Sequence, residues 1–150
     1  MKNFKKYENT YTNSLEKPEI LVGGDAVSDE IINQIKNMGM TPIKSSAANI
    51  VSFSIDLSSN CIVLDYKNAS DAIVSLLKIL RLKPYTKIIV AAEILSLSEA
   101  MEIIDLGAVD CFIKPIDYKE LEWRISEVIS ENFFTNIDLK SHETTDHMSV

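Results

Sequence analysis

The sequence is short of the residues that mark secreted and membrane proteins. Its 150 residues include only two cysteines, Cys61 and Cys111, too few for a disulfide framework or a cysteine metal site. Both lie in apolar runs, so we expect core thiols and a reducing, cytoplasmic location. No apolar run reaches the roughly 18 residues of a membrane span, and the polar N-terminus has no apolar core of the signal-peptide type.

Positive charge is also scarce. Fifteen Lys and Arg residues stand against 22 Asp and Glu residues, which gives a net charge of −7. Proteins that bind nucleic acid directly need a basic surface for the phosphates, so we do not expect this function. A small acidic domain is more easily interpreted as one that binds proteins or metal ions.

Short apolar runs alternate with helical patterns along the chain. The apolar runs predict strands over residues 20–22, 41–45, 61–65, 87–91 and 109–113. Ser28, Ser70-Asp71 and Asp117 are expected to cap helices, residues 96–106 are expected to be helical, and a weaker helix is expected over 47–57.

This alternation predicts an α/β fold. Short loops between strands and helices imply right-handed βαβ units and a parallel sheet with helices on both faces. We therefore predict a (βα)5 doubly wound domain over residues 18–131, with the flavodoxin-like strand order 2-1-3-4-5. Cys61 and Cys111 then lie two strands apart, roughly 9–10 Å, which is too far for a disulfide. Residues 1–17 and 132–150 are expected to form a flexible lead and tail.

Three charged residues stand at predicted strand ends. Asp25 follows the first strand, Asp65 ends the third and Lys114 follows the fifth. In parallel sheets, ligands bind beyond the carboxyl ends of the strands, where these side chains should converge. This convergence is the main functional signal in the sequence.

The segment Gly107-Ala108-Val109-Asp110-Cys111-Phe112-Ile113-Lys114-Pro115, together with Asp25 and Asp65, resembles the CheY-like receiver domain of response regulators. The resemblance extends from about residue 18 to 131. It implies that Asp65 is the nucleophile that accepts a phosphoryl group from a sensor histidine kinase or a phosphotransfer protein. It also implies that Lys114 pairs with a phosphoryl oxygen, and that the Lys114-Pro115 bond is cis.

The resemblance further implies a magnesium site. Asp25, Asp65 and the backbone carbonyl of Lys67 would hold Mg²⁺, which neutralises charge during phosphoryl transfer. The usual acidic pair is here Gly24-Asp25, so the site should bind Mg²⁺ more weakly.

Other positions depart from the family pattern. Ala91 stands where a Ser or Thr is expected, and Cys111 replaces the usual aromatic residue. Both halves of the customary switch are therefore missing. The loop over residues 66–70 also lacks its usual Pro and Gly.

We therefore expect a stand-alone receiver, not an enzyme, that signals by protein contact. The contact face would be built from the helix over 96–106, the strand over 109–113 and the last helix; its residues would include Glu99, Glu102, Asp110, Tyr118 and Trp123. The alternative is a pseudo-receiver, a binding module that never accepts phosphate. A flavin- or nucleotide-binding protein of the same topology is a third hypothesis, although the sequence has no G-x-G-x-x-G motif. A hydrolase is less favoured, because both histidines, His142 and His147, fall in the predicted tail, where we expect them to be solvated.

Overall fold

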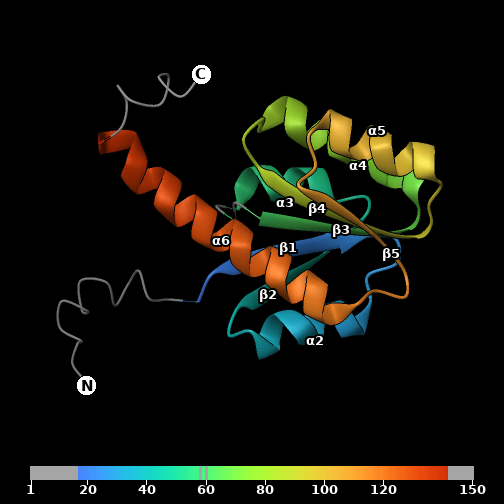
Figure 1. The fold of residues 1–150 in the computed structure, drawn as a ribbon. Coiled ribbons are helices and arrows are strands. Elements are labelled where there is room, and N and C mark those ends of the chain that lie inside the picture. The colour runs from blue at the N-terminus through green and yellow to red at the C-terminus, as the bar shows by residue number, and fades with distance from the viewer. Residues whose placement is uncertain (1–16, 58, 60, 142–150) are drawn as a thin grey trace.

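A five-stranded parallel sheet forms the centre of the computed structural model, which describes residues 17–57, 59 and 61–141 (Figure 1). The strands pair in the order β2-β1-β3-β4-β5, which confirms the predicted topology. They are β1 (Glu19–Gly24), β2 (Thr41–Ser46), β3 (Cys61–Asn68), β4 (Lys87–Ile94) and β5 (Asp110–Ile113).

Helices cover both faces of the sheet. They are α2 (Asp29–Asn37), α3 (Ile50–Asp56), α4 (Ala69–Leu82), α5 (Leu97–Leu106) and α6 (Tyr118–Ser141). Side chains of α3, α4 and α5 form one buried cluster with one face of the sheet. Side chains of α2 and α6 pack on the other face. Successive residues of β1 take opposite sides: Leu21 joins the first cluster, and Ile20 and Val22 join the second.

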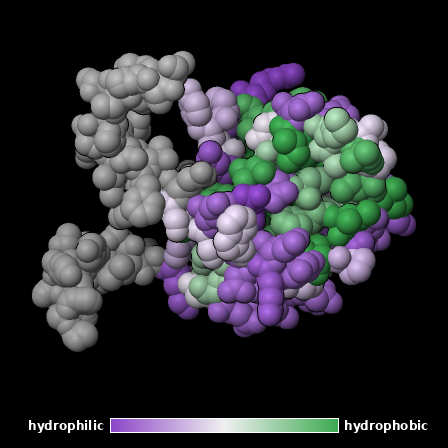
Figure 2. All heavy atoms as spheres, viewed as in Figure 1, coloured by the Kyte–Doolittle hydropathy of each residue, from purple (hydrophilic) through white to green (hydrophobic). Residues whose placement is uncertain are grey.

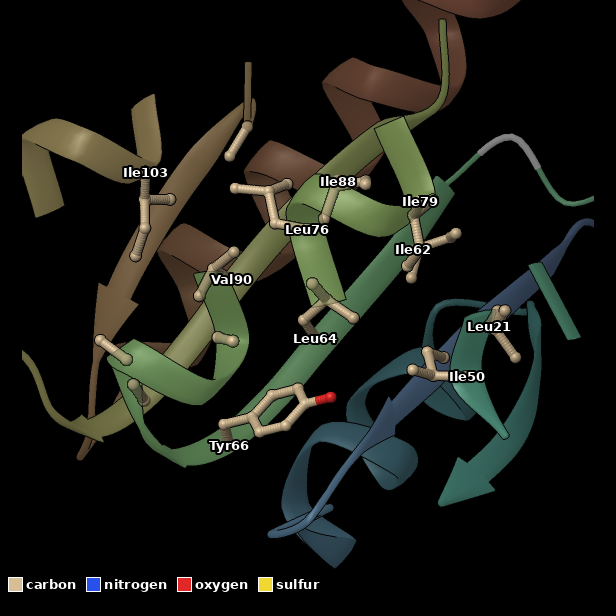
Figure 3. Close-up of a cluster of buried hydrophobic side chains, with 14 residues drawn as sticks. Leu21, Ile50, Ile62, Leu64, Tyr66, Leu76, Ile79, Ile88, Val90 and Ile103 are labelled. Atoms are coloured by element: carbon tan, nitrogen blue, oxygen red, sulfur yellow. The ribbon is translucent and has the colours of Figure 1, made fainter. Parts of the chain in front are cut away.

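The first cluster shows why these runs are apolar throughout (Figure 3). Ile62 and Leu64 of β3 lie against Leu76 and Ile79 of α4, and all four side chains are fully buried. Tyr66 ends this row, and its buried hydroxyl shares a hydrogen bond with Ser75 of α4. Because both faces of the sheet are covered, its central strands lack the alternation of polar and apolar residues that a one-sided sheet would show.

Several boundaries differ from the predicted ones. β3 and β4 pair as far as Asn68 and Ile94, so Asp65 lies inside a strand and does not end it. Consequently α4 begins at Ala69 with Asn68 in the cap position, and the prediction of a Ser70-Asp71 cap was wrong. α3 begins at Ile50, three residues later than predicted, because residues 47–49 form a non-helical turn between β2 and the helix.

The last helix extends beyond the predicted domain. α6 continues to Ser141, so residues 132–141 are helical where a flexible tail was expected. Once a helix is formed, each further residue adds a hydrogen bond at little cost, and composition alone does not mark where it stops. Residues 1–16 and 142–150, which include His142 and His147, lie outside the described residues. Among the described helices, none is long and apolar enough to cross a membrane.

The two cysteines are free thiols on β3 and β5, with β4 between them, as the topology predicted. Cys61 is buried and Cys111 half-buried. Burial raises the pKa of Cys61 to about 12 and that of Cys111 to about 11, the latter with help from the charge of Asp110. Neither thiol has the lowered pKa of a reactive cysteine.

Gly24 ends β1 in close contact with β3. Its φ is +146°, and a Cβ atom at this position would lie 2.0 Å from the backbone oxygen of Asp65. No side chain fits there without moving the backbone of one strand or the other. The resemblance leads us to expect an acidic side chain at this position, and the close approach of the two strands leaves no room for one.

We predict that Gly24→Ala lowers the free energy of unfolding by roughly 3 kcal/mol, because strain and overpacking add. Gly39→Ala is the matched control, since Gly39 has a φ of +83° but no atom within 4 Å of a built Cβ. It should cost only about 1 kcal/mol. Urea unfolding of both variants measures the difference, and equal losses would show that the contact with Asp65 is unimportant.

Candidate functional site

Asp65 is the centre of the site. It lies on β3 opposite Ala91 of β4, and its side chain has 0% exposure. A carboxylate taken out of water is costly unless charges and hydrogen bonds compensate it. The surrounding residues must therefore supply donors to both of its oxygens.

Lys114 supplies the compensating charge. Its backbone N–H donates to Ala92, which fixes the residue directly after β5, and the cis Lys114-Pro115 bond follows as predicted. The ammonium lies 2.5 Å from Asp65 Oδ1, an oxygen with no other polar partner among the described residues. The same ammonium donates to the carbonyl of Ala26 at 3.2 Å. The predicted meeting of Asp65 and Lys114 is thus present.

Ser28 supplies donors to the other oxygen. Its backbone N–H lies 2.9 Å and its hydroxyl 3.1 Å from Asp65 Oδ2. Ser28 does occupy the N-cap position of α2, but its side chain makes no capping hydrogen bond, so the expected cap was only half right. A hydrogen bond that involves a charged group is stronger than one between neutral groups, so the hydroxyl donates to the carboxylate and does not accept from a backbone N–H of α2.

The segment between β1 and α2 is held against the end of β3. The N–H of Ala26 donates to the backbone oxygen of Asp65 at 3.2 Å. Asp25 is exposed, and its Oδ1 accepts a hydrogen bond from the backbone N–H of Lys67, with 2.9 Å between oxygen and nitrogen. These bonds, together with those of Ser28, place the segment over Asp65 and explain why its side chain is inaccessible.

Mg²⁺ does not fit the predicted ligands in this arrangement. Asp25, Asp65 and the carbonyl of Lys67 are oxygen donors of the type that Mg²⁺ takes, with waters completing a near-octahedral set, but the ion would have to displace the present partners of the two carboxylates. Both oxygens of Asp65 are engaged with Ser28 and Lys114, and Asp25 is bonded to the N–H of Lys67. Among the described residues no group of three or more His, Cys, Asp or Glu side chains is placed to hold a metal ion.

The two positions of the customary switch, Ala91 and Cys111, carry neither the hydroxyl group nor the aromatic ring that the resemblance leads us to expect. Ala91 and Ala92 are fully buried beside Asp65 and Tyr66, and neither has a hydroxyl group. Cys111 lies on β5 opposite Val90 and packs against the α3–α4–α5 side. The resemblance identified these absences from the sequence, because it expects a Ser or Thr at the position of Ala91 and an aromatic residue at that of Cys111.

Tyr118 adds a neighbour that the sequence did not predict. It belongs to α6 and is half-buried against the α2–α6 side of the sheet. Burial raises the pKa of Tyr118, the charges of Glu30 and Asp65 raise it further, and a side-chain hydrogen bond with Ser28 lowers it. Tyr118 therefore lies beside Ser28 and the Asp65 carboxylate, although it was expected at the contact face.

Solved structures of receiver domains share this fold over most of the chain. A response regulator receiver domain protein from Clostridium thermocellum matches with a TM-score of 0.70 and 18% identity, covering 79% of this chain and 98% of the other. The chain has the fold of a CheY-like receiver domain. No protein-family model and no curated protein matches the sequence.

Two further receiver domains are also similar. The receiver domain of response regulator 1452 from Francisella has a TM-score of 0.64 and 23% identity, with 77% of this chain and 99% of that chain covered. A CheY-like receiver domain protein from Methanospirillum hungatei has a TM-score of 0.65 and 21% identity, with 77% and 95% covered. At these identities the comparison establishes the receiver fold and leaves the chemistry to the residues themselves.

We predict that Lys114→Met lowers the free energy of unfolding by about 3 kcal/mol, because it leaves a buried carboxylate without its cation. The control is Arg124→Met: Arg124 Nε lies 2.8 Å from Asp110 Oδ2, but both side chains are partly exposed. Such a pair contributes less than about 1 kcal/mol. Adding Asp65→Asn to Lys114→Met should recover part of the loss in urea unfolding; no recovery would contradict a charge-based role.

Proposed function

We propose that this receiver-fold chain is a phosphorylation-independent signalling module that acts by binding another protein and catalyses no reaction. The observation that carries this proposal is the state of Asp65. Its side chain has 0% exposure, and its two oxygens are taken by Lys114 and by Ser28. A nucleophilic carboxylate needs an accessible oxygen that a phosphorus atom can approach to about 3–3.5 Å in line.

An exposed apolar surface supports a role in protein contact. We call it the α5–β5–α6 face; its large exposed side chains are Leu97, Met101, Ile104, Ile113 and Trp123, and Ile94 at the end of β4 is also exposed. Leu97 is 78% exposed and Trp123 is 60% exposed, although both are residues that proteins tend to bury. Figure 2 shows hydrophobic surface on the side of the molecule where α5 and β5 lie. Apolar surface of this kind marks interaction sites.

The edge of the face indicates the kind of partner. Glu93, Glu102 and Asp105 are exposed on or beside α5. On the α6 side, Arg124 is bonded to Asp110 and Glu127 and lies over the ring of Trp123, 5.1 Å from its centre. A partner with an apolar centre and basic residues at its edge would complement this surface. We propose that such a protein in the cytoplasm is the downstream partner.

A second candidate function is phosphate acceptance on Asp65. It is favoured by the Lys114 ammonium, which lies on Asp65 Oδ1 and could pair with a phosphoryl oxygen instead. In this case a sensor histidine kinase or phosphotransfer protein would supply the phosphoryl group and Asp25, Asp65 and Lys67 would have to rearrange around Mg²⁺. The segment that carries Ser28 would have to leave Asp65 first.

The two candidates differ in one measurement. We expect no gain in intact mass when the protein is incubated with acetyl phosphate and excess Mg²⁺, because neither oxygen of Asp65 can reach phosphorus. An active receiver domain treated in parallel is the positive control. Addition of one phosphoryl group to the wild type, lost in Asp65→Ala, would overturn the proposal in favour of the second candidate.

A further inference from the structure

Ser28 has two contacts that its place in the sequence does not require. A serine at a helix N-cap ordinarily accepts a hydrogen bond from a backbone N–H of the first turn. Here both its N–H and its hydroxyl donate hydrogen bonds to Asp65 Oδ2, and α2 begins without a side-chain cap. The acidic residues Asp29 and Glu30 in the first turn support the helix start in its place.

We infer that Ser28 is a positioning residue that keeps Asp65 unreactive by occupying Oδ2. The inference rests on the proposed function and deepens it, since it names the residue responsible. Phosphoryl transfer from acetyl phosphate requires an Asp65 oxygen to form the O–P bond while acetate leaves phosphorus with the bonding electron pair. An oxygen that accepts two hydrogen bonds and lies under a closed segment cannot make that approach.

The surrounding contacts hold Ser28 in this position. The segment before it is fixed by the bond from Ala26 N–H to Asp65 and by the bond from Lys67 N–H to Asp25. Gly24 allows β1 to approach β3, since a Cβ there would meet the backbone oxygen of Asp65.

The other oxygen is closed by a different group. Oδ1 faces Lys114, whose ammonium also bonds the Ala26 carbonyl in the same segment. Lys114 is the residue that a receiver keeps at this place, whereas the closure of Oδ2 belongs to Ser28 alone among the described residues. Removing the hydroxyl of Ser28 leaves only its backbone N–H on Oδ2, so this is the side-chain group whose loss should loosen the closure of that oxygen.

The test compares Ser28→Ala with Ser28→Thr in acetyl phosphate and excess Mg²⁺, with labelling followed by intact mass. Ser28→Ala should label on Asp65 at a rate roughly tenfold or more above the wild type, because a hydrogen bond to a charged group is lost. Ser28→Thr keeps the hydroxyl and should stay unlabelled. The label should disappear in the Ser28→Ala/Asp65→Ala double variant.

Ser96→Ala is the matched control for stability. Ser96 caps α5 with its side chain, in a capping box with Glu99, and has no contact with Asp65. It should lower the urea midpoint without any labelling, which separates loss of a helix cap from release of the carboxylate. If Ser28→Ala does not fold, Ser28→Cys replaces it, because a thiol is a weak donor of similar size.

The outcomes separate the two proposals. Labelling of the wild type at the rate of Ser28→Ala would refute the proposed function and the role of Ser28 together. An unlabelled wild type with equally unlabelled, folded Ser28→Ala and Ser28→Cys would refute the role of Ser28 only. Labelling of Ser28→Thr as fast as Ser28→Ala would show that the hydroxyl is not the closing group.

Discussion

The carboxyl edge of the sheet is organised around one buried negative charge. Asp65 lies inside β3 with apolar neighbours on both faces of the sheet, so its charge must be compensated within the protein. Lys114 reaches it from the end of β5 and Ser28 reaches it from the start of α2. Segments from three parts of the chain are thereby joined at one point.

The same requirement accounts for several local features. Gly24 has no side chain because β1 passes against the backbone of Asp65. The hydroxyl of Ser28 donates to the carboxylate and accepts no capping hydrogen bond from α2, because a bond to a charged group is stronger than one between neutral groups. Asp25 turns to the N–H of Lys67 and closes the segment. Here Lys114 and Ser28 satisfy the charge from within the protein.

Much of the fold was predictable because apolar runs and helical periodicity are properties of local sequence. The five strands, their order and the alternation of helices were confirmed, as were the free thiols of Cys61 and Cys111. Element ends were harder: β3 runs past Asp65 because β4 continues beside it, and such pairing is not written in either segment alone. For the site, the pairing of Asp65 with Lys114 could be predicted because both residues were expected near the carboxyl ends of strands. Ser28 could be predicted at the start of a helix. Whether its hydroxyl caps the helix or bonds Asp65 depends on the tertiary contact between this segment and β3, which the local sequence does not show.

The central claim is that the protein itself satisfies Asp65. A crystal structure of the wild type grown in excess Mg²⁺ tests this most directly, because an ion that binds receivers is then offered to the carboxylate. The account predicts the N–H and hydroxyl of Ser28 on Oδ2, the ammonium of Lys114 on Oδ1, and no ion on Asp65. Mg²⁺ bound to Asp65, with Ser28 turned away to cap α2, would contradict it.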